Sequence, residues 1–188
     1  MTKKRMLAAL ALSLALLMTL TVSAEPVAVT PDSLIGDWNV SEYEGMTISF
    51  GEDGIMRMTM AGQTITYRWI VQDGALYLGS MTCEVDGGTM TLALYGGAPE
   101  ESIVLTRDGE GEGLIGTWRA VNNGVTQEMT FSEDGTVRAV TSAGQHVYAD
   151  ETTTWILEDG VLFNGVDCVH DGESMIIGLN GSMLSLTR

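Results

Sequence analysis

An internal repeat constrains this chain more than any other feature of its sequence. Motifs of the first half return in the same order about 80 residues later, which is the signature of a duplicated structural unit. The order of the matches predicts two repeats, residues 34–107 and 114–188, joined by the acidic glycine segment 108–113, and we expect each repeat to fold as its own domain. The matching segments are LIGDW (34–38) and LIGTW (114–118), FGEDG (50–54) and FSEDG (131–135), Trp69 and Trp155, Cys83 and Cys168, Met90 and Met175, and LTR (105–107 and 186–188).

Apolar and polar residues alternate along both repeats, and this two-residue period is typical of β-strands. In the first repeat it runs through Met46, Ile48 and Phe50, and Asp-Gly pairs between such runs predict hairpin turns. A meander of about eight strands must close to avoid open edges. The sequence therefore predicts an all-β fold of two tandem small antiparallel up-and-down β-barrels, with two small sandwiches as the alternative.

The first residues of the chain resemble a targeting signal. Lys3, Lys4 and Arg5 precede an apolar run over 6–22, and small residues follow at 22–24. This pattern predicts a secretory signal peptide over 1–24 with cleavage before Glu25, and a leader over 25–33. We expect a secreted, extracytoplasmic protein, and an uncleaved membrane anchor is the alternative.

The charge of the chain excludes one class of partner. Nine basic residues stand against 25 acidic ones, for a formal net charge of -16. Contact with phosphate backbones or with an anionic membrane surface would be repulsive. We expect no nucleic-acid partner, and no membrane partner once the signal peptide is removed.

Each repeat begins with a GxW motif and ends with an arginine. The motifs are Gly36–Trp38 and Gly116–Trp118, and the arginines are Arg107 and Arg188. These features resemble the closing signature of the lipocalin superfamily, and the whole repeat is similar to short lipocalin-like domains of bacterial secreted proteins. The resemblance implies that each tryptophan plugs one barrel end under its own arginine, Trp38 with Arg107 and Trp118 with Arg188, in a cation-π contact.

The sequence lacks the motifs of the common catalytic sites. Its two histidines, His146 and His170, are not accompanied by a GxSxG, SxxK or Cys-His signature, and His170 is expected to be solvated at a hairpin tip. The alternating Met56, Met58 and Met60 are interpreted as core residues rather than a Cu(I) site, and the Asp-Gly segments as turns rather than calcium loops. We therefore expect that the protein is not an enzyme and that it binds no cofactor and no metal.

Two cysteines and a set of bulky residues bear on the barrel interiors. Cys83 and Cys168 occupy equivalent sites, so each is expected to be a buried free thiol in its own barrel, with a disulfide between them as the alternative. Large side chains should fill the first barrel and leave no room for a fatty acid or haem. The expected filling residues are Phe50, Met56, Trp69, Tyr77 and Leu92.

The second repeat carries an insertion that the first repeat lacks. It lies between AGQ (143–145) and Trp155, and its residues His146, Tyr148 and Asp150 would line one side of an extended strand at a barrel rim. Such a polar set suits ligand recognition, although a tolerated loop extension is the alternative. We expect a secreted, non-catalytic binding module for a small apolar or amphipathic ligand. The alternative is an extracellular protein-interaction or inhibitor module that uses loops and the inter-domain groove.

Overall fold

A computed structural model describes residues 28–96, 102–179 and 181–188 of the chain. The predicted signal peptide and its cleavage site lie outside these residues. The expected all-β class is confirmed, because the described residues form fifteen strands and one short helix, α2 (Pro31–Leu34). Over the same residues, no helix has the length and apolar character needed to cross a membrane.

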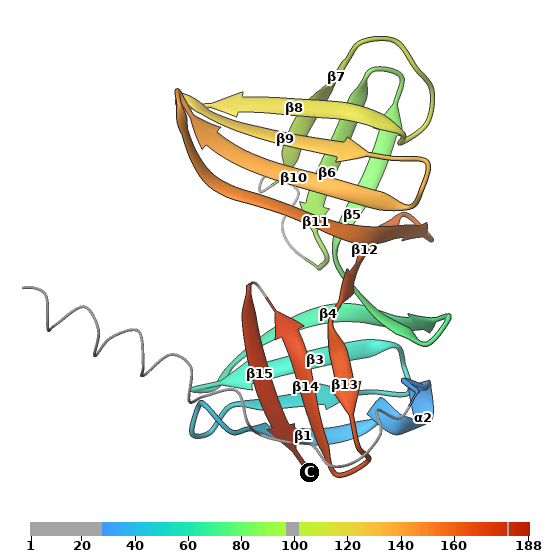
Figure 1. Ribbon diagram of the computed structural model, residues 1–188, viewed down its shortest axis with the longest axis vertical. Coiled ribbons are helices and arrows are strands. Elements are labelled where there is room, and N and C mark those ends of the chain that lie inside the picture. The colour runs from blue at the N-terminus through green and yellow to red at the C-terminus, as the bar shows by residue number, and fades with distance from the viewer. Residues whose placement is uncertain (1–27, 97–101, 180) are drawn as a thin grey trace, which may run out of the picture.

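Eight strands form a closed antiparallel barrel. Each strand from β5 to β12 pairs with the next one along the chain, and β12 then returns to pair with β5 (Figure 1). The predicted barrel architecture is therefore confirmed for this unit. The strands are β5 (Ala75–Asp86), β6 (Thr89–Leu94), β7 (Ile103–Asp108), β8 (Gly116–Asn122), β9 (Val125–Phe131), β10 (Thr136–Ala143), β11 (His146–Glu158) and β12 (Val161–Val166).

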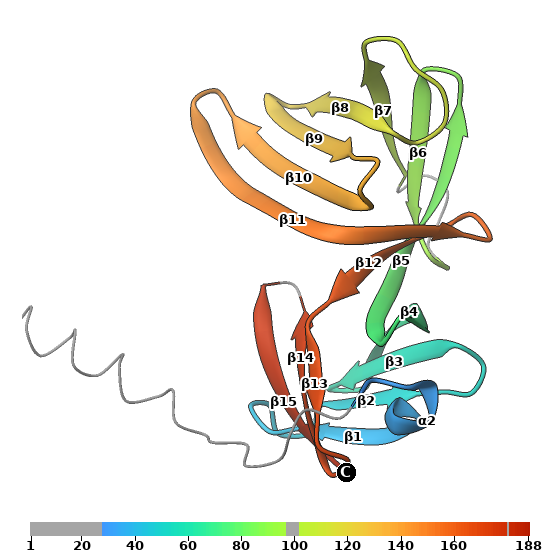
Figure 2. The same ribbon diagram turned by 45° about the vertical axis from the view of Figure 1, so that its right-hand side comes forward.

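The remaining strands form a second unit. They pair in the order β13-β14-β15-β1-β2-β3-β4, and β4 pairs with the first half of β5. Asp167 alone separates β12 from β13, so this sheet also returns to β5 through β12 (Figure 2). The strands are β1 (Gly36–Val40), β2 (Thr47–Phe50), β3 (Ile55–Met60), β4 (Gln63–Gln72), β13 (Cys168–His170), β14 (Ser174–Leu179) and β15 (Ser182–Thr187).

Strands of the two predicted repeats pair with each other. At the end of the first repeat, β7 pairs with β8 of the second repeat, while β1 pairs with β15 at the other end of the chain. The closed barrel thus combines the second half of the first repeat with the first half of the second repeat. This replaces the expected arrangement of one barrel for each repeat, and the segment 108–113 joins two neighbouring strands of one barrel rather than two domains.

Strand exchange also changes which arginine meets which tryptophan. The Arg188 guanidinium carbon lies 4.7 Å from the Trp38 ring centre, and that of Arg107 lies 4.2 Å from the Trp118 ring centre. The pairs expected within each repeat, Trp38 with Arg107 and Trp118 with Arg188, are therefore wrong. The physical reason is that a last strand supplies its arginine to whichever first strand lies beside it, and β1 lies beside β15.

The predicted hairpin turns are present. Asp73 and Gly74 have φ of 52° and 77°, and Asp159 and Gly160 have φ of 50° and 71°. Two successive residues with positive φ are the mark of the type I′ turn, which matches the twist of a hairpin.

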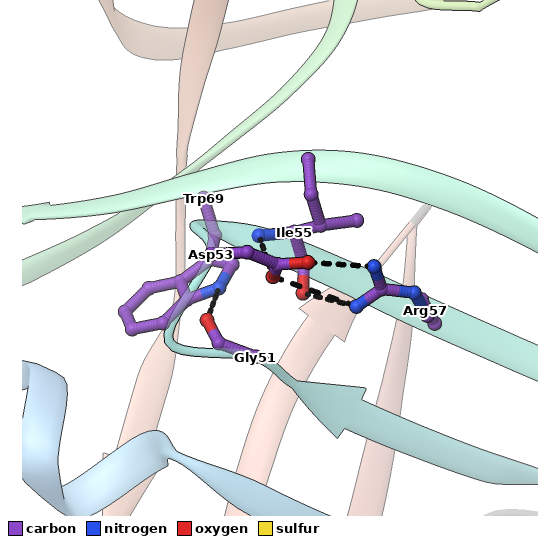
Figure 3. Close-up of polar contacts among 5 residues, drawn as sticks. All are labelled: Gly51, Asp53, Ile55, Arg57 and Trp69. Carbon is purple, nitrogen blue, oxygen red and sulfur yellow. Dashed lines mark hydrogen bonds and ion pairs between the residues drawn. The ribbon is translucent and has the colours of Figure 1, made fainter.

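The EDG segment between β2 and β3 is a turn that side chains fasten (Figure 3). Asp53 accepts a hydrogen bond from the Ile55 amide at 3.0 Å and pairs with Arg57 at 2.7 Å. The hydrogen bonds from Arg57 and Ile55 hold the pKa of Asp53 below its usual value. Trp69 from β4 donates its indole N–H to the Gly51 carbonyl at 3.2 Å, which ties the turn to the neighbouring strand.

Each unit has its own apolar core, and the filling residues divide between them. Phe50, Met56 and Trp69 are buried in the second unit as expected, whereas Leu92 is buried in the closed barrel because β6 belongs there. Tyr77 is only half-buried. Equivalent aromatic pairs meet edge to face in the two cores, with ring centres 5.5 Å apart for Phe50–Trp69 and 5.3 Å for Phe131–Trp155.

Candidate functional site

Trp118 packs in the closed-barrel core. It is fully buried and donates its indole N–H to the Leu114 carbonyl at 2.8 Å. Arg107 stacks on it and donates hydrogen bonds to the carbonyls of Gly113 and Ile115, the latter at 2.6 Å. These contacts fix the segment that leads into β8.

The closed barrel has a partly open cavity of about 230 Å³. Its surface is mainly apolar, and its polar lining residues are Ser80, Gln127, Glu128, Thr141 and Asn164. This combination is typical of small-molecule sites, in which an apolar wall supplies affinity and a few polar groups fix orientation. The apolar lining includes Met81, Leu92, Ile103, Leu105, Met129 and Leu162.

Asn164 is a polar residue of this cavity with an unsatisfied hydrogen-bond acceptor. It lies on β12, where the chain crosses between the two units, and its buried Oδ1 atom has no hydrogen-bond donor among the residues that the structure describes. A buried acceptor without a donor costs about 1–3 kcal/mol, so native proteins satisfy nearly all of them. A ligand N–H or O–H in the cavity would supply the missing donor.

A second cavity, of about 450 Å³, adjoins the first where the two units meet. Asn164 and Ser80 line both cavities, so a ligand held in the barrel can extend past these residues into the junction. The charged residues that line the junction are both acidic, Glu151 and Asp167. The junction therefore favours neutral or cationic groups.

The structure places the three residues predicted for ligand binding on β11, away from the lining of both cavities. The rings of His146 and Tyr148 meet edge to face at 4.5 Å, and both side chains are exposed. Asp150 accepts two hydrogen bonds from Arg138, at 2.7 and 2.6 Å, and these lower the pKa of its carboxyl. Ligand binding by these three residues stays a prediction.

The two cysteines are free thiols in separate cores. Cys83 is buried in the closed barrel, and Cys168 packs against the core of the second unit. Burial disfavours the thiolate and raises the pKa of each to about 11. Neither cysteine has the depressed pKa of a reactive thiol.

The predicted exposure of His170 is wrong. This side chain is buried, its Nε2 lies 3.2 Å from the Ala28 carbonyl oxygen, and its Nδ1 has no partner within the described part of the chain. The leader segment before α2 covers β13 at this point, which the hairpin pattern alone does not reveal. Within 28–96, 102–179 and 181–188, no group of three or more His, Cys, Asp or Glu side chains is placed to hold a metal ion.

Asn164 was not among the residues predicted from the sequence. The signal was present, because an asparagine directly follows the buried apolar run Val161–Phe163 on the same strand. Comparison of the chain with protein-family models, with curated proteins and with solved structures gives no match.

Proposed function

We propose that this chain is a secreted, non-catalytic binding protein that holds a small amphipathic ligand in its closed barrel. The proposal rests on the mainly apolar cavity and on Asn164, which lines it next to the junction and whose Oδ1 is an unsatisfied hydrogen-bond acceptor. The apolar part of the ligand would contact Met81 and Met129, and a donor group would face Asn164. The signal-like residues 1–24 and the lipocalin-like motifs support export and this mode of binding.

The cavity volume limits the ligand. An engineered apolar cavity of about 150 Å³ holds benzene, and pockets for drug-sized ligands measure about 300–1,000 Å³. At about 230 Å³ the barrel cavity suits one ring or a short alkyl chain. A longer ligand would have to place its polar end in the junction beyond Ser80 and Asn164.

Phenol and toluene test the proposal because they differ by one hydrogen-bond donor. We expect the ratio of the phenol affinity to the toluene affinity to be about 3- to 10-fold lower in Asn164→Leu than in the unmodified chain. This factor corresponds to the free energy of one hydrogen bond. Titration calorimetry or ligand-observed NMR on the full chain measures both affinities. A ratio that Asn164→Leu leaves unchanged, or no binding of either probe at millimolar concentration, would contradict the proposal.

Stability provides a second readout for the same variant. Asn164→Leu removes a buried hydrogen-bond acceptor that has no donor. It should therefore raise the free energy of unfolding of the unliganded protein by about 1–3 kcal/mol. A loss of phenol preference together with a gain in stability is the pattern expected of a binding residue. If Asn164→Leu instead lowers stability, Asn164 has a structural role.

A cavity-filling variant, with a matched control, tests whether the probes bind in the barrel cavity. Ala139 lines the cavity on β10, so Ala139→Phe should abolish binding of both probes, whereas Ala75→Phe, at the exposed first residue of β5, should not. The thermal transition of each variant shows whether it is folded. Equal binding by Ala139→Phe and Ala75→Phe would place the ligand outside the barrel.

A further inference from the structure

Different parts of β11 pair with the neighbouring strands on its two sides. β10 pairs with it from His146 to Thr154, but β12 pairs with it only from Trp155 to Glu158. In Figures 1 and 2 β12 turns away from β11 toward the second unit. Over the described residues, the segment 146–152 therefore has an open edge on the side of the second unit.

The hydrogen-bond register shows which backbone groups lie on this edge. The Trp155 amide donates to the Gly135 carbonyl on the β10 side. Backbone groups of an antiparallel strand point alternately to its two sides, so Glu151 and Thr153 also face β10. The N–H and C=O groups of Asp150 and Thr152 consequently face the open side.

A groove lies beside this open edge. It is the junction cavity of about 450 Å³, with Glu151 and Thr153 of β11 on one wall and the β14–β15 hairpin on the other. Gly178 and Gly181 of that hairpin leave the groove free of side chains at two positions, while Met183, which is 56% exposed, offers apolar contact. An extended chain paired with the open edge would lie beside this groove and place alternate side chains in it.

The charges of the groove select the partner. Glu151 and Asp167 line it, none of its described lining residues is basic, and the chain as a whole has a net charge of -16. Asp150 is already paired with Arg138 and so offers its backbone rather than its carboxylate. A partner with lysine or arginine side chains would be attracted, whereas an acidic one would be repelled.

We propose that the open edge of β11 and the junction groove bind an extended, basic peptide segment of another protein by strand addition. The segment pairs through its backbone with Asp150 and Thr152 and places basic side chains near Glu151 and Asp167. This proposal does not depend on a small ligand held inside the barrel, since none of these four residues lines the barrel cavity.

Proline scanning of the edge tests the proposal. Thr152→Pro removes an N–H that faces the open side and breaks no ladder bond with β10, whereas Thr152→Ala removes the same side chain and keeps the N–H. A library of random ten-residue peptides is selected on the full chain. We expect enrichment of peptides that contain lysine or arginine. These peptides should bind Thr152→Ala as tightly as they bind the unmodified chain, and their affinity for Thr152→Pro should be at least about 10-fold lower.

Further readouts separate the possible outcomes. The bound peptide should slow hydrogen exchange of the Asp150 and Thr152 amides. Glu151→Gln should lower the affinity for basic peptides at low salt. No enriched peptide, or equal binding to Thr152→Pro and Thr152→Ala, would overturn the proposal. So would a dimer of the chain that Thr152→Pro abolishes, because it would assign the edge to a second copy.

The outcome is independent of the small-ligand experiment. Ala139→Phe, at a position that lines the barrel cavity and not the junction groove, should leave peptide binding unchanged, and Thr152→Pro should leave the affinity for phenol unchanged. Failure of either proposal can therefore be recognised without reference to the other.

Discussion

Arg188 and Arg107 make the same set of contacts at equivalent places in the two units. Arg188 stacks on Trp38 and donates to the Ser33 carbonyl at 3.1 Å, and Arg107 does the same with Trp118 and Gly113. We expect Arg188→Ala to lower the free energy of unfolding by about 1–3 kcal/mol, since it removes one cation-π contact and the hydrogen bonds to the Ser33 and Ile35 carbonyls. Chemical denaturation measures this change.

The tryptophan that responds identifies the pairing. Because Arg188 covers Trp38, the fluorescence of Trp38 should shift in Arg188→Ala while that of Trp118 stays constant; single-tryptophan variants assign the signals. Arg188→Lys should recover only part of the stability, because an ammonium cannot stack and fork together. Arg107→Ala is the matched control and should shift Trp118. A response of Trp118 to Arg188→Ala would contradict the exchanged pairing.

Cysteine reactivity is predictable at the same scale. With a pKa of about 11, the Cys83 thiol at pH 8 is ionised to about one part in a thousand, against about a quarter for a free cysteine. Alkylation of the folded protein by iodoacetamide should therefore be about 100-fold slower than that of the denatured protein, and should rise with pH toward 11. Mass spectrometry follows Cys83 and Cys168 separately. Equal rates in both states would show that the thiols are accessible.

At the scale of elements, the sequence predicted the strands better than their continuity. Leu76 and Leu78 alternate at even positions, whereas Met81 and Cys83 alternate at odd ones, so the pattern suggests two strands. The structure has one strand, β5, which crosses from the core of the second unit into the closed barrel. Its buried side changes where the strand changes core, and a one-residue phase shift is the expected result.

The crossing of β5 and β12 depends on a residue without a side chain. A Cβ atom at Gly79 would lie 2.6 Å from Val161 and 3.0 Å from Phe163, on the facing strand. We expect Gly79→Ala to destabilise the protein by about 1–3 kcal/mol through overpacking. Gly88→Ala is the matched control, because nothing lies within 4 Å of its Cβ position. Thermal unfolding measures both, and equal stability would show that the crossing adapts.

At the scale of the whole molecule, the exchange of strands could not be predicted from the repeat. The two LTR segments are identical, and the residues around Trp38 and Trp118 match, so the same closing contacts form with either partner. The short connection between β7 and β8 was the available signal. A tandem arrangement must close two pairs of distant strands, whereas exchange makes one of these pairs a local hairpin with a lower entropy cost. The candidate site was missed for the same reason, since Asn164 meets Ser80 only where β12 crosses β5.

Paired cysteines distinguish the two arrangements in solution. Asn39 of β1 faces Thr187 of β15, whereas in a tandem arrangement it would face Thr106, the equivalent residue of β7. Facing residues of antiparallel strands have Cα atoms about 4.5–5.5 Å apart, within the range that a disulfide spans. Under mild oxidation we expect a bond in the Asn39→Cys, Thr187→Cys variant and none in the Asn39→Cys, Thr106→Cys variant.

Peptide mapping by mass spectrometry locates the bond, and the single variant Asn39→Cys shows whether the native thiols take part. Cys83 and Cys168 should stay free, because each is held in a core of its own. The opposite result, a bond from position 39 to 106, would mean that each repeat closes on itself. The crossing of β5 and β12 would then be lost, and with it both the junction beside Asn164 and the open edge of β11, because these exist only where strands of the two repeats share one barrel.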